Sequence, residues 1–468
     1  MESIIDFAQL AFHNILTYGV SFLVVLGILV FVHEWGHYIV ARLCGVRVDT
    51  FSIGFGREIW GRTSKAGTRW KISLFPLGGY VKMFGDVNGA SAGHTEQVDD
   101  GSGHAREMTA EEKEVAFFTK PVWKRSLIVF AGPAINFLFA IILLAGLYMG
   151  VGRPITPPEI SAVEVGSASY NAGFQPRDMI KTIDGDKFAT FDEMRREVLL
   201  TLDQELKFVV VRDGQDVEIK VTPQKITDKD RFGFVHERGY LGLIGPGNGI
   251  DMKFISAVNG VETGGDIQKA HQMVVDNIEK SAMIETMIEG RKTKLLTHIP
   301  RDINKQLFDD KDPTHNVVFL GVKPNNEFRK YNPFSAVGIA IKETYNITAD
   351  TLGAIWQMVT GTRSAKELGG IIRIGAMAGD MAQQGIISLI LFTALLSINL
   401  GLINLFPIPL LDGGHLVFYG IEAVNGKPVS EQVQEYAFRF GLVVLVCLMV
   451  FSNLNDILQM FVFKGGDS

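Results

Sequence analysis

The chain has 468 residues and a formal net charge of -6 at pH 7, with 47% hydrophobic and 21% charged residues. This mixture favours membrane spans joined to soluble modules over a purely soluble or purely membrane-embedded protein. The negative charge gives no electrostatic footprint for nucleic acid, which we exclude as a partner. Only Cys44 and Cys447 are present, which excludes a disulfide framework.

Four segments are apolar and long enough to cross a bilayer, which needs about 20 residues. The first transmembrane helix is expected within residues 1–42, with its apolar run at 18–41. The others are expected at 126–150, at 386–412 with an apolar part that ends at 406, and at 437–462. Asn136, Ser397 and Asn399 lie in uncharged spans and are interpreted as polar residues that hold helices together. The predicted fold class is a polytopic α-helical membrane protein with four transmembrane helices.

The first span contains His33-Glu34-Trp35-Gly36-His37. On a helix, His33 and His37 lie one turn apart on one face, so both imidazoles can bind the same zinc ion, one per chain. Glu34 lies beside them and can take a proton from a metal-bound water. Ionisable residues inside a membrane helix are costly, so this position favours a functional site over a chance match.

Residues 43–125 are expected to form a cytosolic, membrane-associated β-hairpin region. Apolar stretches punctuated by glycine at 51–56, 70–76 and 78–83 are typical of short strands. Basic residues flank this region at Arg42, Arg47, Lys120 and Lys124, which indicates the cytosolic side of the membrane. Both termini and residues 151–385 are then expected on the outer side.

An internal repeat follows the second span. Its first copy has Ile183-Asp184-Gly185, a helix near 191–202, a strand at 208–211 and a turn at 213–214. Its second has Val258-Asn259-Gly260, a helix near 265–277, a strand at 283–288 and a turn at 289–290. The two glycines of each copy are 29 (185 to 214) and 30 (260 to 290) residues apart, which predicts two copies of one β-rich domain, at 155–225 and 228–325.

Residues 334–360 carry apolar positions at helical spacing, interrupted by Lys342, Glu343 and Asp350. This pattern predicts an interfacial amphipathic helix on the outer membrane surface. The stretch from Leu368 to Gly385 is rich in glycine and alanine and is expected to be a flexible lead-in to the third span.

A tetrahedral zinc ion with two histidine ligands and a water lacks one protein ligand. The strongest candidate is Asp412, because it follows a long apolar, proline-containing segment and is hard to explain as surface charge. The first and third spans both run from outside to inside. The histidines in the inner half of the first and Asp412 at the inner end of the third should therefore reach the same depth. His415 is the competing ligand.

An HExxH sequence in the first span, NxxPxPxxDG after the third and a repeated β-rich domain between the second and third resemble the site-2 protease family of intramembrane zinc metalloproteases. The resemblance extends over essentially the whole chain and includes FSIGFG, GGYVKM and Ala131-Gly132-Pro133 with Asn136-Phe137. It implies that His33, His37 and Asp412 bind zinc and that Glu34 is the catalytic base. It also implies two substrate-binding elements. Asn404 would help to hold the substrate backbone. A strand would pair with an unwound substrate segment, and its residues are Gly78, Gly79, Tyr80, Val81, Lys82 and Met83.

The two copies resemble PDZ domains, the first more fully, through Asn171 to Ile180. The second lacks this upstream half and is degenerate. PDZ domains bind peptides by adding a strand to an exposed edge, so peptide termini are a possible partner of the first copy. The alternative is that both copies only shield the membrane site.

The resemblance implies hydrolysis of peptide bonds in transmembrane segments of single-pass proteins that have already been trimmed. Anti-sigma factors, signal-peptide remnants and envelope stress signalling are implied as its context. The implied location is the bacterial inner membrane, with the PDZ-like domains and both termini periplasmic and the active site near the cytosol. A catalytically silent PDZ membrane scaffold is the alternative and predicts no dependence on Glu34 or zinc. A cation transporter is a weaker alternative function, because no paired repeat of broken helices is visible in the sequence.

Overall fold

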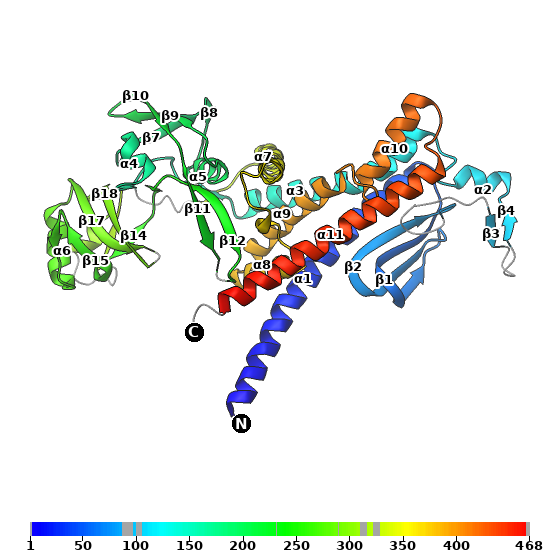
Figure 1. The fold of residues 1–468 in the computed structure, drawn as a ribbon, viewed down its shortest axis with the longest axis horizontal. Coiled ribbons are helices and arrows are strands. Elements are labelled where there is room, and N and C mark those ends of the chain that lie inside the picture. Colours follow the sequence, from blue (N-terminus) through cyan, green and yellow to red (C-terminus); the bar gives the residue numbers. More distant parts are fainter. Residues whose placement is uncertain are drawn as a thin grey trace.

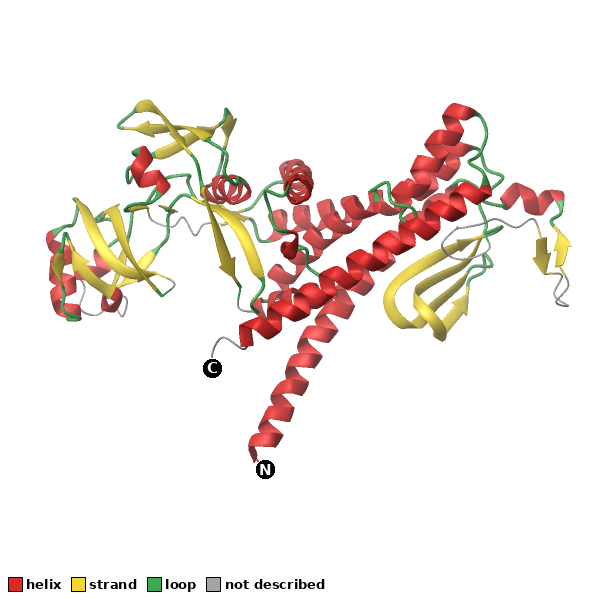
Figure 2. Ribbon diagram, viewed as in Figure 1, coloured by secondary structure: helices red, strands yellow, loops and turns green. Residues whose placement is uncertain are grey.

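The computed structural model describes residues 2–86, 97–99, 105–230, 232–288, 290–308, 316–321 and 328–464. Long helices form its centre, a β-hairpin lies at one end, and β-rich modules lie at the other (Figures 1 and 2). This arrangement places the apolar helices between two groups of strands, as expected of a membrane protein with soluble modules.

Within the described residues, four helices are long and apolar enough to cross a membrane, as the sequence predicted. They are α1 (Glu2–Leu43), α3 (Val122–Gly150), α9 (Ile386–Asn404) and α11 (Glu431–Lys464). The third helix ends at Asn404 and does not continue to Asp412, because Pro407 and Pro409 lack the N–H groups that a helix needs. A new helix, α10 (Asp412–Asn425), begins at the aspartate.

The expected strands after the first span are present in β1 (Val48–Thr63) and β2 (Arg69–Met83). The two strands are bent so that together they form four adjacent rows of one sheet. Residues 58–63 pair with 69–73, residues 50–55 pair with 69–75, and residues 48–53 pair with 79–83. Residues 79–83 therefore form an edge of this sheet among the described residues. The chain then passes through β3 (Gln97–Asp99), β4 (Ala105–Glu107) and α2 (Ala110–Val115) to α3.

A similar order of strands and helix occurs twice in the region of the expected repeat. The first copy contains β7 (Met179–Ile183), β8 (Asp186–Lys187), α5 (Phe191–Leu200), β9 (Leu206–Arg212) and β10 (Gln215–Val221), preceded by α4 (Ala168–Ala172). The second contains β15 (Ile255–Val258), β16 (Val261–Glu262), α6 (Ile267–Asp276), β17 (Ser281–Ile288) and β18 (Arg291–His298). Asp184-Gly185 and Asn259-Gly260 both have positive φ angles, the geometry of a two-residue hairpin turn.

The division between the copies differs from the expected one. Strand β6 (Ala162–Glu164) lies within the range expected for the first copy but pairs with β18 and with β13 (Leu243–Ile244), in the sheet of the second. Successive side chains of a strand point to opposite faces, so Val163 of β6 lies in the core of the first copy and Ala162 lies in the core of the second. In addition, β11 (Gln224–Lys229) and β12 (Val235–Tyr240) form a separate ribbon across the expected boundary at 225–228.

The remaining short elements lie partly in the second copy, whose core includes Met252, Leu307 and Val318, and partly between the modules and the helices. They are β5 (Arg153–Pro154) paired with β20 (Phe328–Arg329), β14 (Gly249–Asp251) paired with β19 (Val317–Phe319), and the 3-10 turns Met252–Phe254, Lys305–Phe308 and Ala365–Glu367. Helix α7 (Pro333–Thr360) has nearly the bounds that the sequence predicted.

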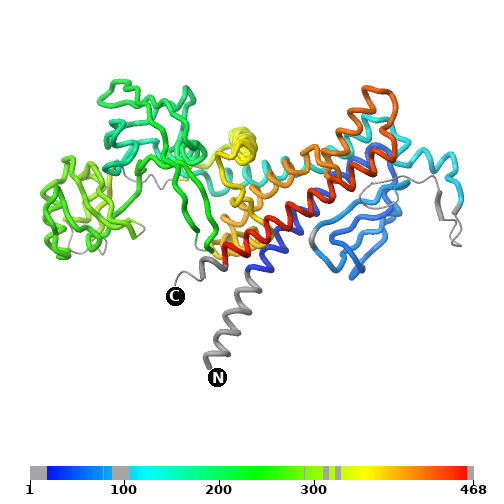
Figure 3. The backbone as a smooth tube through the Cα atoms, viewed as in Figure 1, coloured from blue at the N-terminus to red at the C-terminus, as the bar shows by residue number. Residues whose placement is uncertain are grey.

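The expectation of a flexible lead-in at 368–385 is wrong, because residues Ile371–Gln384 form helix α8. Its N-terminus is capped by Asp456 of α11, whose carboxylate accepts the N–H groups of Gly370 at 2.9 Å and Arg373 at 3.0 Å. The Asp456 side chain is fully buried, with Nε of Arg373 at 3.7 Å. A carboxylate at a helix N-terminus pairs the N–H groups that have no partner within the helix. In Figure 3, α11 crosses the bundle from the hairpin side to the side of the β-modules.

We expect Asp456→Ala to unfold the first turn of α8 locally. The change removes two backbone acceptors and leaves Arg373 without its buried carboxylate, and breaking such a pair costs about 3–5 kcal/mol. Hydrogen exchange of residues 371–374 should accelerate at least about tenfold in detergent-purified protein. Glu435→Ala, which removes an exposed ion pair with Arg439 in the same helix, is the control and should change nothing there. Unchanged exchange in Asp456→Ala would contradict the capping role.

Candidate metal centre

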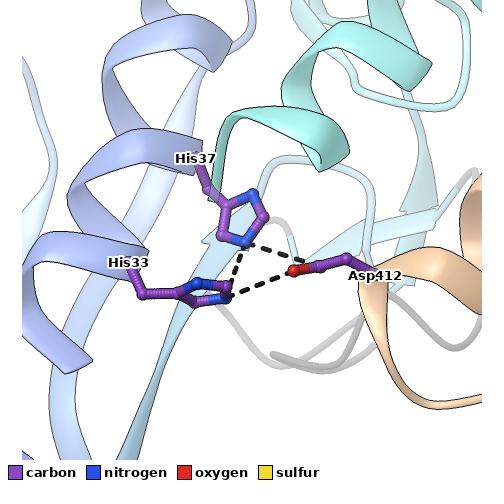
Figure 4. A group of neighbouring side chains, drawn as sticks. All are labelled: His33, His37 and Asp412. Atoms are coloured by element: carbon purple, nitrogen blue, oxygen red, sulfur yellow. Dashed lines mark hydrogen bonds and ion pairs between the residues drawn. The ribbon is translucent and has the colours of Figure 1, made fainter. Parts of the chain in front are cut away.

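Helix α1 and the start of α10 bring together the three residues that the sequence indicated as zinc ligands. Figure 4 shows the imidazoles of His33 and His37 and the carboxylate of Asp412 pointing at one another. The two Nε2 atoms are 3.3 Å apart, His33 Nε2 is 3.3 Å from Asp412 Oδ2, and His37 Nε2 is 3.5 Å from Asp412 Oδ1. Residues far apart in the chain thus converge on one point.

This arrangement fits a zinc ion. Ligand atoms bound tetrahedrally at about 2.0 Å from zinc lie about 3.3 Å from each other, which is the spacing seen here. Asp412 Oδ2 is buried and accepts no hydrogen bond from the described part of the chain. A buried carboxylate oxygen without a donor is costly, and a bound cation would satisfy it.

The second ring nitrogen of His37 has a fixed partner. Its Nδ1 donates to the backbone carbonyl of Ile128 in α3, at 2.9 Å. A carbonyl can only accept, so the proton is on Nδ1 and the lone pair of Nε2 faces His33 and Asp412. The backbone of α3 therefore sets the tautomer that a metal ligand requires.

The segment between α9 and α10 delivers Asp412. Leu410 has a φ angle of 82°, in the left-handed region that leucine adopts only at a cost of about 1–2 kcal/mol. Gly413 follows the aspartate, and a Cβ atom there would lie 2.3 Å from the carbonyl oxygen of Leu405. The tight return that aims Asp412 at α1 thus depends on a glycine and on a strained leucine beside the ligand.

Helices α1 and α3 approach very closely at the level of the histidines. A Cβ atom on Gly36 would lie 2.5 Å from the carbonyl oxygen of Ala131, and one on Gly132 would lie 2.2 Å from His37 Nε2. The sequence interpretation did not identify either glycine as part of the site. A glycine inside HExxH and a Gly-Pro pair in the next span are, however, a readable signal for a close helix crossing.

The three residues face a cavity of about 530 Å³. Its lining includes Glu34 and the predicted substrate residues Gly79, Tyr80, Val81, Met83 and Asn404, together with His33, His37, Phe55, Val129, Leu410, Leu411, Asp412 and His415. Gly78 and Lys82 belong to the same chain segment but are not among the lining residues. Glu34 is 9% exposed, and Nδ2 of Asn404 lies 3.5 Å from His33 Nε2.

His415, the competing ligand, lies in the cavity wall but outside the group of three converging ligand atoms. Its ring is 5.3 Å from that of Phe438 in α11. The geometry favours Asp412 as the third ligand.

Membrane-spanning helices around a buried site of two histidines, a carboxylate and a neighbouring glutamate define the class of membrane-embedded zinc metalloproteases. The family model of peptidase family M50 matches residues 21–448, and the chain belongs to this family. This confirms the family that the motifs indicated. The protein is a zinc metalloprotease that crosses the membrane several times.

Relatives match over most of their length. A protein of Agrobacterium fabrum named as a zinc metalloprotease is 36% identical over 440 residues, which cover 94% of this chain and 95% of the relative. A similarly named protein of Rhizobium meliloti is 34% identical and covers 94% and 96%. The regulator of sigma-E protease RseP of Escherichia coli is 33% identical over 467 residues, which cover 93% of this chain and 97% of the relative.

We expect Gly132→Ala to weaken zinc binding by at least about tenfold, a size typical of disturbed metal-ligand support. The added Cβ atom would collide with the tip of His37 and displace its Nε2 from the other ligand atoms. Zinc affinity is measured by competition with a chromogenic chelator. Gly146→Ala is the matched control, because a Cβ atom on that glycine of the same helix has no heavy atom within 4 Å. Equal affinities of the two variants would show that the close approach does not matter.

Proposed function

We propose that this protein hydrolyses peptide bonds within, or at the inner edge of, membrane-spanning segments of single-pass membrane proteins. The observation that carries the proposal is the convergence of His33, His37 and Asp412, beside Glu34, in a cavity among membrane-type helices. A complete set of ligands and base argues against the alternative of a catalytically silent scaffold, which would need none of them.

Zinc held by His33, His37 and Asp412 would lower the pKa of a bound water to about 7 and polarise the scissile carbonyl. Glu34 is the proposed general base: it accepts the proton of the attacking water and passes it to the leaving amine. Asn404 lies in the same cavity, and its amide can donate to a backbone carbonyl of the substrate. The low exposure of Glu34 keeps bulk water away from this proton transfer.

A transmembrane helix hides its carbonyls in i→i−4 hydrogen bonds, so a substrate must unwind before water can attack. We propose that the segment Gly78–Met83 receives the unwound stretch as an added strand. Residues 79–83 form an edge of their sheet in the described structure. A Cβ atom on Gly79 would lie 3.0 Å from Cγ of Glu34, so this edge passes directly beside the proposed base.

The two β-modules are proposed to be PDZ-like domains, near 155–225 and 228–325, that exclude substrates with bulky outer domains. A groove of about 270 Å³ between α5 and residues 238–245 could also receive a peptide terminus. Its apolar walls, from residues such as Phe191, Met194 and Val198, suit an apolar terminal side chain.

Helix α7 is proposed to lie on the outer membrane surface. Figure 1 views α7 almost end-on while α3 and α9 extend across the picture, so α7 runs across the bundle. Its exposed face carries Phe334, Tyr345, Trp356 and Val359, all more than half exposed. A helix in the interface presents such a face to lipid.

The proposed location is the bacterial inner membrane, with the β-modules and both termini in the periplasm and the metal centre nearer the cytosol. The basic residues between the first two spans support this orientation. The likeness to a regulator of sigma-E protease supports anti-sigma factors and signal-peptide remnants as substrates and envelope stress as the context.

We expect Glu34→Gln to abolish cleavage of a short membrane-spanning substrate while one zinc ion per chain is retained. The amide cannot accept the water proton, whereas the three ligands are untouched. Asp412→Asn, assayed in parallel, should lose both cleavage and zinc. Cleavage and zinc content are measured on detergent-purified protein. Retained cleavage in Glu34→Gln would refute the proposed function.

If the substrate binds as an added strand, disulfide cross-links between protein and substrate should form at every second substrate position. In a protein with Tyr80→Cys and Glu34→Gln, and with Cys44 and Cys447 replaced by alanine, cysteines at every second substrate position near the scissile bond should cross-link. Thr63→Cys, in the row of the same sheet farthest from residues 79–83, is the control and should give no cross-link. A repeat of three to four residues would show that the substrate stays helical and would contradict strand addition.

A further inference from the structure

The two histidines differ in the partner of their Nδ1 atoms. His37 faces a backbone carbonyl, which can only accept a proton. His33 faces the side-chain amide of Asn136 in α3, with Nδ1 and the amide nitrogen 3.1 Å apart. An amide can present either its nitrogen or its oxygen to a neighbour, so this contact does not by itself fix the tautomer of His33.

Asn136 has no explanation in packing alone. Its side chain is fully buried, and its Oδ1 atom accepts no hydrogen bond from the described residues. A buried polar atom without a partner costs about 1–3 kcal/mol, which a leucine of similar size would avoid. The sequence interpretation treated Asn136 as a residue that holds helices together. Its contact with His33 does join α3 to α1, but Ser397 and Asn399 join helices away from the histidines: Ser397 Oγ donates to the Asn136 carbonyl at 2.8 Å, and Asn399 accepts from Thr351 at 3.2 Å.

The chemistry of imidazole decides which amide atom suits a metal site. A neutral imidazole carries one proton. If the amide nitrogen donates to Nδ1 of His33, the proton is on Nε2, which then cannot bind a metal ion. If the amide oxygen accepts the Nδ1 proton, the Nε2 lone pair faces His37 and Asp412. A half turn of the amide group exchanges the two atoms without moving the rest of the side chain.

We propose that Asn136 is a positioning residue for the metal centre, whose amide oxygen accepts the Nδ1 proton of His33 when zinc is bound. One face of α3 then serves both histidines over three successive turns. Ile128 holds the ring of His37 through its carbonyl, Gly132 leaves room for the ring tip, and Asn136 holds the ring of His33. The proposal rests on the ligand role proposed above for His33.

The test compares zinc affinities of the full-length protein by competition with a chelator. Asn136→Leu fills the same space without an acceptor and should bind zinc about 10–100-fold more weakly, the usual effect of losing such a partner. Asn136→Asp keeps an oxygen acceptor and offers no N–H donor, so it should stay within about threefold of the unmutated protein. Asn399→Leu removes a polar contact between helices away from the site and should leave the affinity unchanged.

Two results would overturn the proposal: wild-type affinity in Asn136→Leu, or an affinity in Asn136→Asp as low as in Asn136→Leu. His33→Ala separates this failure from that of the proposed ligand set. If His33→Ala binds zinc as tightly as the unmutated protein, the ligand assignment is wrong. If only His33→Ala is weakened, the assignment holds and the role of Asn136 does not.

A measurement on the unmutated protein covers the case in which the Asn136 variants do not fold. With cobalt in place of zinc, proton NMR should show two exchangeable, strongly shifted imidazole N–H signals, one for each Nδ1. A single signal would show that only one histidine binds the metal through Nε2 with its Nδ1 proton held, and would overturn the proposal.

Discussion

The close crossing of α1 and α3 at Gly36 and Gly132 is the contact on which the metal centre depends. It lets the backbone of α3 reach the histidines of α1, so that the Ile128 carbonyl lies 2.9 Å from His37 Nδ1. If the axes of α1 and α3 were about 8–10 Å apart, as in most helix packings, Nδ1 of His37 would have no partner. The ligand atoms also have to lie about 3.3 Å apart to share one tetrahedral ion, so the crossing has little freedom.

Asp412, the proposed third ligand, depends on the opposite feature, an interruption of the helix. A continuous α9 would carry Asp412 beyond the level of the histidines, because each helical residue advances about 1.5 Å. Pro407 and Pro409 end the helix, and Leu410, in a left-handed conformation, turns the chain back toward α1. Backbone of this kind at membrane depth is tolerated only where protein or a water-filled cavity surrounds it. The cavity lined by Leu410 and Leu411 meets that condition.

The sequence predicted what depends on local spacing: the four spans, the repeated order of elements, and the residues His33, His37 and Asp412 that converge in the structure. It could not predict features that depend on distant partners. Helix α8 looked like a flexible segment because its cap, Asp456, comes from another helix 86 residues after Gly370. Strand β6 joins the sheet of the second copy, and its residues Val163 and Ala162 face the cores of both copies. Asn136 does contact another helix, as the sequence indicated, but its histidine partner could not be predicted because it lies 103 residues away.

The polar residues of the fourth span form hydrogen bonds with backbone groups of neighbouring segments. The Lys366 carbonyl, before α8, accepts from Asn455 at 2.7 Å and from Gln459 at 2.9 Å. Gln459 also accepts the backbone N–H of Val235 in the β11–β12 ribbon. At its other end the same helix packs against the proline turn, since a Cβ atom on Gly441 would lie 2.2 Å from the Pro409 carbonyl. The same helix therefore contacts both the β11–β12 ribbon and the turn that precedes Asp412, and its polar residues Asn455 and Gln459 have structural partners.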